Sequence, residues 1–345
     1  MIRVDLRSDT VSHPSPEMRK AMAEAELGDD VYGDDPTVNK LQDMAAEKLG
    51  KEAGLFVSSG TQGNLVAMLA HCQRGDAVAL GELSHIYNSE AGGTSVLGGI
   101  AMRILPNEKS GAISADAIRA AGEPGDYHKS PVKVFAFENT QNNAGGTAIT
   151  PDETAVMVEA ASSLGLKVHM DGARIWNSVV AQNVAATELT EGVDSITFCL
   201  SKGLACPIGS VLVGSKEFIE EADRWRKMLG GGMRQVGVVA AAGVVALNSM
   251  IDRMADDHAN ARKLAEGLAE YPDVEIDLES VQTNIVRFAV PSGVGHPFAA
   301  AMYEEGVYMN SGDSSLRFVP HYGIDSEDID FTLLAVKKAM AAATS

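Results

Sequence analysis

The sequence predicts an α/β protein with a large domain, built on a mainly parallel sheet between helices, and a smaller C-terminal α+β domain. From about residue 16 to 246, stretches with the helical period alternate with short β-branched runs, which is typical of parallel strands joined by crossover helices. After Asn248 the pattern changes to a long polar helix followed by short strand-like runs. We therefore expect a large domain at 1–248, including an N-terminal arm at 1–15, and a small domain at 249–345.

Seven short apolar runs are the strand candidates of the large domain. Several are apolar throughout, as strands covered on both faces should be. They are 54–57, 77–80, 102–105, 132–137, 167–170, 195–200 and 210–213. Between them lie helix candidates such as 151–164, where Pro151 stands at the start and two acidic residues follow. Acidic side chains in the first turn favour the positive end of the helix dipole.

The small domain is predicted from the changed pattern after Asn248. We expect a helix at 251–271, strands at 274–278 and 284–290, a helix at 296–305, a strand at 315–319 and a final helix from Ser326.

Charge and composition exclude several classes of partner. The chain has 345 residues, 28 Lys and Arg against 47 Asp and Glu, a formal net charge of −19, and 45% hydrophobic residues. The hydrophobic content fits one or two globular domains. The acidic balance argues against nucleic acid and against an anionic membrane surface, because both are bound by clustered Lys and Arg.

The cysteines and the N-terminus bear on the cellular compartment. Cys72, Cys199 and Cys206 are an odd number without CxxC spacing, so we expect neither a disulfide framework nor a zinc site. The first ten residues carry four charges where a signal peptide needs an apolar core. We expect a cytoplasmic protein. The apolar run 236–247 is too short to cross a bilayer and predicts a buried helix.

The turn from Ser58 to Thr61 is a candidate phosphate site. It follows the strand candidate 54–57 and precedes an apolar helical run, so its N–H groups and hydroxyls would stand at a helix N-terminus, where anions bind. Taken alone, these residues favour an ordinary helix N-cap.

A carboxylate and a lysine follow two neighbouring strand candidates. Asp171 ends the run at 167–170, and Lys202 follows the run at 195–200 within an apolar stretch. Open α/β folds bind ligands at this carboxyl edge. A desolvated lysine loses its proton readily and attacks carbonyl groups. The alternative for Lys202 is a buried stem with its amine in water.

Together these three features predict pyridoxal phosphate. Its aldehyde condenses with a lysine, its ring nitrogen pairs with a carboxylate, and its phosphate needs N–H and hydroxyl donors. The sequence has no GxGxxG after the first strand, no P-loop and no HExxH, which disfavours a dinucleotide enzyme, a nucleotide hydrolase and a zinc peptidase.

Eight short motifs are spread along the sequence: DLRSDTV from Asp5, GDDVYGDDP from Gly28, the SSGT turn, HIY from His85, ENTQN from Glu138, MDGAR from Met170, LSKG from Leu200 and GGGMRQ from Gly230. In these motifs the chain resembles the L-threonine aldolases of the aspartate-aminotransferase fold type, essentially from end to end.

The resemblance implies the cofactor-binding residues. Lys202 would form a Schiff base with pyridoxal 5'-phosphate, and Asp171 would pair with the ring nitrogen. Ser59, Gly60 and Thr61 would hold the phosphate, and His85 would stack on the ring. The alternative for His85 is a loop residue that bonds Glu82 or Glu90.

The resemblance also implies the substrate-binding residues. Ser8, Arg174 and Arg317 would bind the carboxylate of a small amino acid, although an interdomain ion pair would explain Arg317 as well. His128 would recognise the substrate hydroxyl, where a solvated loop histidine is the simpler reading. Tyr32 would be an active-site aromatic residue. Lys227 and Arg234 would enter the neighbouring subunit's site, within a homotetramer built of two dimers. Gln141 departs from the family, because many relatives have His there, and so carries no pH-dependent role.

The implied reaction is the cleavage of L-threonine or L-allo-threonine into glycine and an aldehyde, without a metal. The base that removes the hydroxyl proton is His85, His128 or a water between them, with His85 ranked first. A transaminase or β-eliminating enzyme of the same fold is the alternative, and a non-catalytic acidic scaffold is the rival from another class.

Overall fold

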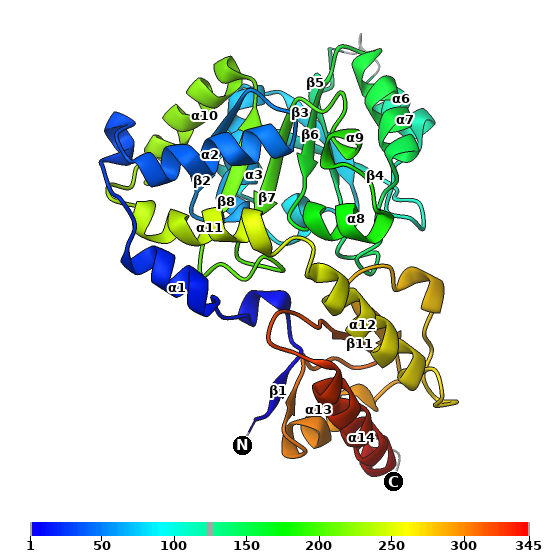
Figure 1. Cartoon of the computed structure of the whole chain (residues 1–345). Helices are drawn as coiled ribbons and strands as arrows, with labels where there is room; N and C mark the ends of the chain where they lie inside the picture. The colour runs from blue at the N-terminus through cyan, green and yellow to red at the C-terminus, as the bar shows by residue number, and fades with distance from the viewer. Residues whose placement is uncertain (1, 123–126, 344–345) are drawn as a thin grey trace.

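The computed structural model describes residues 2–122 and 127–343 (Figure 1). Its large domain is built on one seven-stranded sheet in the order β2-β8-β7-β6-β5-β3-β4. β8 runs antiparallel to β2 and β7, and the remaining pairs are parallel. The strands are β2 Ala53–Val57, β3 Ala77–Gly81, β4 Ala101–Leu105, β5 Val132–Glu138, β6 Lys167–Asp171, β7 Ser195–Cys199 and β8 Ser210–Gly214. All seven predicted strands and the mainly parallel sheet are confirmed.

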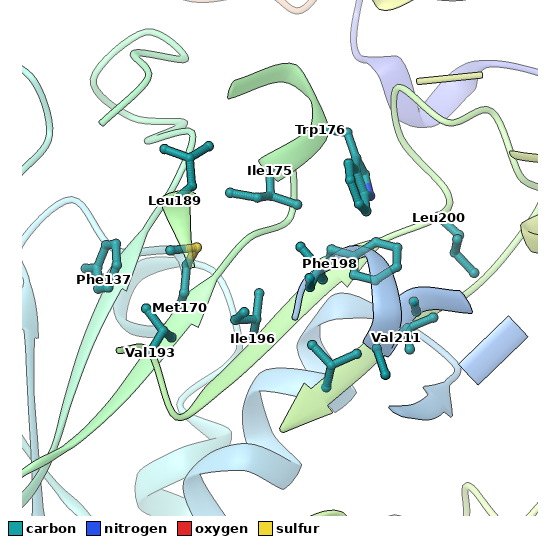
Figure 2. Packing of buried hydrophobic residues seen from close by; sticks show 14 of the residues in the cluster. Phe137, Met170, Ile175, Trp176, Leu189, Val193, Ile196, Phe198, Leu200 and Val211 are labelled. Carbon is teal, nitrogen blue, oxygen red and sulfur yellow. The ribbon is translucent and has the colours of Figure 1, made fainter. Parts of the chain in front are cut away.

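Successive strand residues alternate between two hydrophobic cores. In β5, Phe135 and Phe137 belong to one cluster, while Val134 and Ala136 belong to the other. Because the side chains of a strand point to opposite faces in turn, the two clusters lie on opposite faces of the sheet. Figure 2 shows part of the larger cluster, where Phe198 of β7 meets Trp176 edge to face at 5.5 Å. A strand covered on both faces must be apolar throughout, as the sequence is.

Helices cover both faces of the sheet. α2, α7, α8 and α11 contribute to the larger core, and α3 and α10 to the smaller one. The helices of the large domain are α1 Pro16–Ala23, α2 Pro36–Lys48, α3 Gly60–His71, α4 His85–Asn88, α5 Gly93–Gly98, α6 Ala115–Gly122, α7 Pro151–Ser162, α8 Ile175–Gln182, α9 Ala186–Leu189, α10 Lys216–Met228 and α11 Gly237–Ser249, with 3-10 turns η1 Asp9–Val11 and η2 Asp30–Tyr32. α7 starts at the expected proline with a Thr150–Glu153 capping box.

The C-terminal residues form a smaller α+β unit, which lies below the sheet in Figure 1. Its elements are α12 Met254–Leu268, η3 Leu278–Ser280, β9 Val286–Ala289, α13 Gly295–Glu304, β10 Val307–Tyr308, β11 Ser315–Phe318 and α14 Ser326–Ala343. The strand predicted at 274–278 is wrong: only a single bridge joins Glu275 to Ala289, and η3 begins at Leu278. The run has alternating apolar residues, but it offers no further backbone pairing.

The N-terminal arm belongs structurally to the small unit. β1 Val4–Asp5 pairs in parallel with β10, and Val4 and Leu6 are fully buried in the core of the small unit. The chain therefore crosses between the two units before α1, and this brings Ser8 and Asp9 to the junction with the large domain.

The apolar run of the C-terminal half is a buried helix, as predicted. α11 has seven buried residues and packs against α1 and α2. Within the described residues, no single helix is long and apolar enough to cross a membrane, although α11 and α12, bent by 74°, meet these limits as a pair.

Candidate active site

Three strand ends place the predicted lysine, carboxylate and phosphate turn at one edge of the sheet. Asp171 is the last residue of β6, and Lys202 follows β7, which is its parallel neighbour. The turn follows β2 and opens α3. Lys202 is half-buried, and among the described residues its ammonium group makes no hydrogen bond or ion pair. Its carbonyl accepts the N–H of Ala205 at 2.8 Å, which fixes the loop.

The turn at 58–61 presents free donors. Ser59 caps α3 and accepts the N–H of Gln62 at 3.1 Å, so the N-cap reading is correct. The N–H groups of Gly60 and Thr61, however, have no acceptor within the described part of the chain. Gly60 is required here, because a Cβ would stand 2.7 Å from Sγ of Cys199. The two free N–H groups at the helix N-terminus are suited to bind an anion.

Asp171 is held in place by two donors. It is 3% exposed, and its oxygens accept Nδ2 of Asn64 at 2.8 Å and the N–H of Ala173 at 3.1 Å. Each carboxylate oxygen has two lone pairs, so each retains one for a further donor. A protonated ring nitrogen is a donor of this kind.

His85 is connected to Asp171 by hydrogen bonds through Glu90 and Asn64. It begins α4, and its Nδ1 lies 2.8 Å from Oε1 of Glu90, which is buried and also accepts Nδ2 of Asn64 at 2.8 Å. The expected alternative of a bond to Glu90 is therefore present. This hydrogen bond raises the pKa of His85 against the opposing effect of burial, and Asp171 raises it further. With Nδ1 bound to Glu90, Nε2 is the nitrogen left to exchange a proton.

The ENTQN motif forms a second acidic centre next to His85. Oε2 of Glu138 accepts the N–H of His85 at 3.0 Å and Nε2 of Gln141 at 3.1 Å, while its Oε1 accepts the N–H of Asn142 at 3.0 Å. Burial raises the pKa of Glu138 to about 7, with a further rise from the charge of Asp171. Gln141 thus has a structural role, supporting Glu138.

Two arginines meet at Asn142. Nη1 of Arg174 lies 3.3 Å and Nη1 of Arg317 lies 3.1 Å from Oδ1 of Asn142. Arg174 is buried, and its Nε and Nη2 donate to the two carboxylate oxygens of Asp9 at 2.7 and 2.8 Å. Arg317 bonds only neutral oxygens, the second being the carbonyl of Arg7 at 3.4 Å. Within the described residues Arg317 has no ion pair, so the predicted interdomain pair is absent and its charge can take a carboxylate.

Ser8 is connected to this arginine pair through Asp9, because its hydroxyl donates to Oδ1 of Asp9 at 3.4 Å. It is half-buried, caps the short turn η1, and accepts the N–H of Thr10 at 3.3 Å. Its neighbour Asp9 carries the ion pair to Arg174, which places Ser8 at the same junction.

Four of the predicted residues are exposed on the surface of this chain. His128 is exposed and precedes β5, whereas the site lies at the other end of that strand, about 20 Å away for a seven-residue strand. Tyr32 is 77% exposed, Lys227 is exposed, and Arg234 pairs with Asp29 at 2.9 Å. The roles of Lys227 and Arg234 toward a neighbouring subunit, and of Tyr32 as an active-site aromatic residue, stay predictions.

The donor set fits pyridoxal phosphate. A carboxylate with free lone pairs, an unpaired lysine and a helix N-terminus with two free N–H groups match the ring nitrogen, aldehyde and phosphate. His85, Glu90 and Asp171 also place one ligand atom each within 4.8 Å of one another. Nδ2 of Asn64 donates a hydrogen bond to each of the two carboxylates there, Glu90 and Asp171.

Sequence reasoning missed several residues of the site. Asn64, Glu90 and Asp9 are buried polar side chains that bond the predicted residues directly. Asn64 could have been suspected, because it stands in an apolar helical run four residues after Gly60. Glu90 was expected only as a possible partner of His85. Its bond from Asn64 and the pairing of Asp9 with Arg174 depend on tertiary contacts that no local pattern reveals.

The fold and the site define an α/β enzyme with a lysine, a carboxylate and an anion-binding turn at one sheet edge. The model of the beta-eliminating lyase family matches residues 5–291. A probable low-specificity L-threonine aldolase 2 from Arabidopsis thaliana is 44% identical over 342 residues, covering 97% of this chain and 96% of that protein. The low specificity L-threonine aldolase of Escherichia coli (strain K12) is 43% identical over 326 residues, covering 94% and 96%.

A solved structure shows the same fold. The threonine aldolase of Leishmania major superposes with a TM-score of 0.84 at 18% identity, covering 98% of this chain and all of that one. The chain belongs to the beta-eliminating lyase family and, within it, to the group of low-specificity L-threonine aldolases.

Proposed function

We propose that this protein is a pyridoxal-phosphate-dependent lyase that cleaves L-threonine and L-allo-threonine into glycine and acetaldehyde. The observation that carries the proposal is the meeting of Lys202, Asp171 and the α3 N-terminus at one sheet edge, beside the unpaired charge of Arg317. The relatives' names supply the substrate class.

The residues of the site would hold the cofactor at three points. Lys202 would bond its aldehyde, Asp171 would face its ring nitrogen, and Gly60 and Thr61 would donate to its phosphate. When bound, pyridoxal phosphate supplies a cationic ring that accepts the electrons of the broken bond. Asp171 keeps that charge fixed in a water-poor site, where electrostatic stabilisation is strong.

Arg317 would bind the substrate carboxylate as a bidentate fork. Arg174 would position Arg317 indirectly. It is paired with Asp9 and donates to Oδ1 of Asn142, which also accepts from Arg317. Fixing the carboxylate orients the Cα–Cβ bond, and this orientation selects the bond that is cleaved.

His85 is the base of the proposal. Its Nδ1 is engaged by Glu90, its pKa is raised by that bond, and its Nε2 is free to take the proton from the β-hydroxyl group. His128 of the same chain lies at the other sheet edge and has no part in this step.

We further propose that the active unit is a homo-oligomer, at least a dimer and by resemblance a tetramer, in the cytoplasm. Leu27, Val31, Tyr32, Met228 and Val238 are exposed apolar side chains on three segments, and we take them together as one apolar patch. Ion pairs from Arg234 to Asp29 and from Arg226 to Asp30 hold its segments together. A second copy that covers this patch would bury both its apolar area and the nearby basic residues Lys227 and Arg234.

Assay of the four threonine stereoisomers tests the proposal. We expect glycine and acetaldehyde in equal amounts from L-threonine and L-allo-threonine, and none from the D isomers. In a D isomer, the carboxylate at Arg317 and the amino group at the cofactor could not both be in place with the Cα–Cβ bond positioned for cleavage. Amino transfer to an added keto acid, or ammonia and a keto acid in place of glycine, would assign the chain to the alternative reactions instead.

A further inference from the structure

A chain of buried polar side chains runs from the amino end of the sheet to Asp171. Nε2 of His71 lies 2.7 Å from Oγ of Ser195, which lies 2.9 Å from Nδ1 of His169. Nε2 of His169 lies 3.2 Å from Oδ1 of Asn64, whose Nδ2 reaches Oδ2 of Asp171 at 2.8 Å. The three inner residues Ser195, His169 and Asn64 are at most 1% exposed.

Secondary structure brings these side chains into line. Asn64 and His71 are seven residues apart on α3, so they lie two helical turns apart on one face. His169 and Asp171 are two residues apart on β6, so they point to the same face of the sheet. Ser195 stands opposite His169 in the β6–β7 register.

The amide of Asn64 sets the direction of these hydrogen bonds. Nδ2 of Asn64 faces two acceptors, Asp171 and Glu90, each at 2.8 Å, so both of its hydrogens are used and its Oδ1 must accept. His169 must then donate from Nε2, and its Nδ1 must accept. Consequently Ser195 donates to His169 and accepts Nε2–H from His71. Every donor points toward Asp171.

The two histidines of this series of hydrogen bonds, His71 and His169, are neutral at pH 7. Burial lowers the pKa of His169 to about 3 and that of His71 to about 4. A neutral imidazole has one donor and one acceptor nitrogen, and the chain uses both nitrogens of His169. The arrangement is therefore complete without a charge of its own.

We propose that His71, Ser195, His169 and Asn64 are positioning residues that lock the amide of Asn64 against Asp171 and so set the strength of the contact from Asp171 to the cofactor's ring nitrogen. This inference rests on the proposed function, because it assumes pyridoxal phosphate at Asp171.

The lock acts on the orientation of one amide. Without the donor of His169, Oδ1 of Asn64 would be buried without a partner, and the amide would be held at Nδ2 alone. Its bond to Asp171 would then be less firmly fixed. Aligned hydrogen bonds also polarise one another, so the far members of the chain reinforce the last bond. Glu90 accepts from the same amide and bonds His85, so the orientation of Asn64 also affects the position of His85.

The test compares two cofactors that differ only at the ring nitrogen. Dissociation constants are measured with apoprotein for pyridoxal phosphate and for its analogue with carbon in place of the ring nitrogen. The wild-type protein is expected to prefer pyridoxal phosphate. In His169→Leu this preference should shrink about tenfold, the factor that corresponds to one hydrogen bond, while affinity for the analogue stays unchanged. His169→Gln, which keeps a donor, should restore most of the preference.

Controls separate the inference from structural damage and from the proposed function. Ser195→Ala removes only the hydroxyl oxygen and should reduce the preference for pyridoxal phosphate by a smaller factor. It therefore tests the inference even if His169→Leu folds poorly. Asn260→Leu removes a buried amide bond to Ile324 in the small unit and should leave the preference intact. Equal loss for both ligands in His169→Leu and Ser195→Ala, or an unchanged preference, would overturn the positioning role. A wild-type protein that does not bind pyridoxal phosphate would overturn the proposed function instead.

Discussion

Arg174 and Asp9 form a buried, two-pronged ion pair that joins the large domain to the N-terminal arm. Nε and Nη2 of Arg174 lie 2.7 and 2.8 Å from the two oxygens of Asp9, and neither side chain is more than 6% exposed. Burial alone would raise the pKa of Asp9, but the charge and hydrogen bonds of Arg174 lower it well below its usual range. Of the two arginines at Asn142, Arg317 is therefore the one without a carboxylate partner among the described residues.

Removal of Asp9 should therefore cost stability as well as activity. Asp9→Ala leaves the Arg174 charge buried and unpaired, for which we expect a loss of about 3–5 kcal/mol in the free energy of unfolding. Urea denaturation of the apoprotein measures it. Lys338→Ala, which breaks an exposed pair with Glu305, should change the same quantity by less than about 1 kcal/mol. A loss for Asp9→Ala as small as that would show that Arg174 has another partner.

Arg317 should act on substrate binding. Arg317→Lys keeps a positive charge but loses the fork, so KM for L-threonine should rise roughly tenfold to a hundredfold, the range of a charge-assisted hydrogen bond. Steady-state kinetics give KM and kcat separately. Arg287→Lys is the matched control, because Arg287 stands opposite Arg317 in the β9–β11 ladder. An equal rise in both variants would remove Arg317 from the carboxylate site.

The sequence predicted the fold of the large domain because its signals are local. Each buried strand is apolar by itself, and Lys202 and Asp171 stand at strand ends, where parallel topology brings them together. The run at 274–278 was wrongly predicted as a strand, because alternating apolar residues fit a strand but do not show whether a neighbouring strand is there to pair with it. β1 and β10 escaped notice because two-residue strands have no pattern. The pairing of Asp9 with Arg174 and the bond from Asn64 to Glu90 depend on contacts between distant segments. His128 precedes the predicted strand at 132–137, so its place at the amino end of that strand was open to prediction.

His258 should make stability fall in mild acid. Burial lowers its pKa to about 4, and its Nε2 lies 3.1 Å from Nδ2 of Asn177, from which it accepts. The unfolded chain takes up a proton near pH 6.5, whereas the folded one does so only near pH 4. Stability is therefore lost as pH falls through this window, by at most about 1.4 kcal/mol per pH unit. Between pH 6.5 and 5, His258→Gln should lose less unfolding free energy than wild type. Equal slopes in urea titrations would contradict the prediction.

The apolar patch should be needed for assembly. Val238→Glu places a charge in it, and we expect smaller species in sedimentation velocity together with a loss of activity. Val156→Glu is the control, because Val156 is 51% exposed on α7, away from the patch. A Val238→Glu protein that keeps the wild-type mass and activity would remove the patch from the interface.

The central claim is that Lys202 bonds the cofactor, and borohydride reduction of the holoenzyme followed by peptide mapping tests it most directly. Reduction makes the bond between the cofactor and its lysine permanent. We expect the label on the peptide that contains Lys202, and we expect Lys202→Ala to lose both the label and the visible absorbance while keeping the wild-type melting curve. A label on any other lysine, or none on a wild-type protein that cleaves threonine, would contradict the account.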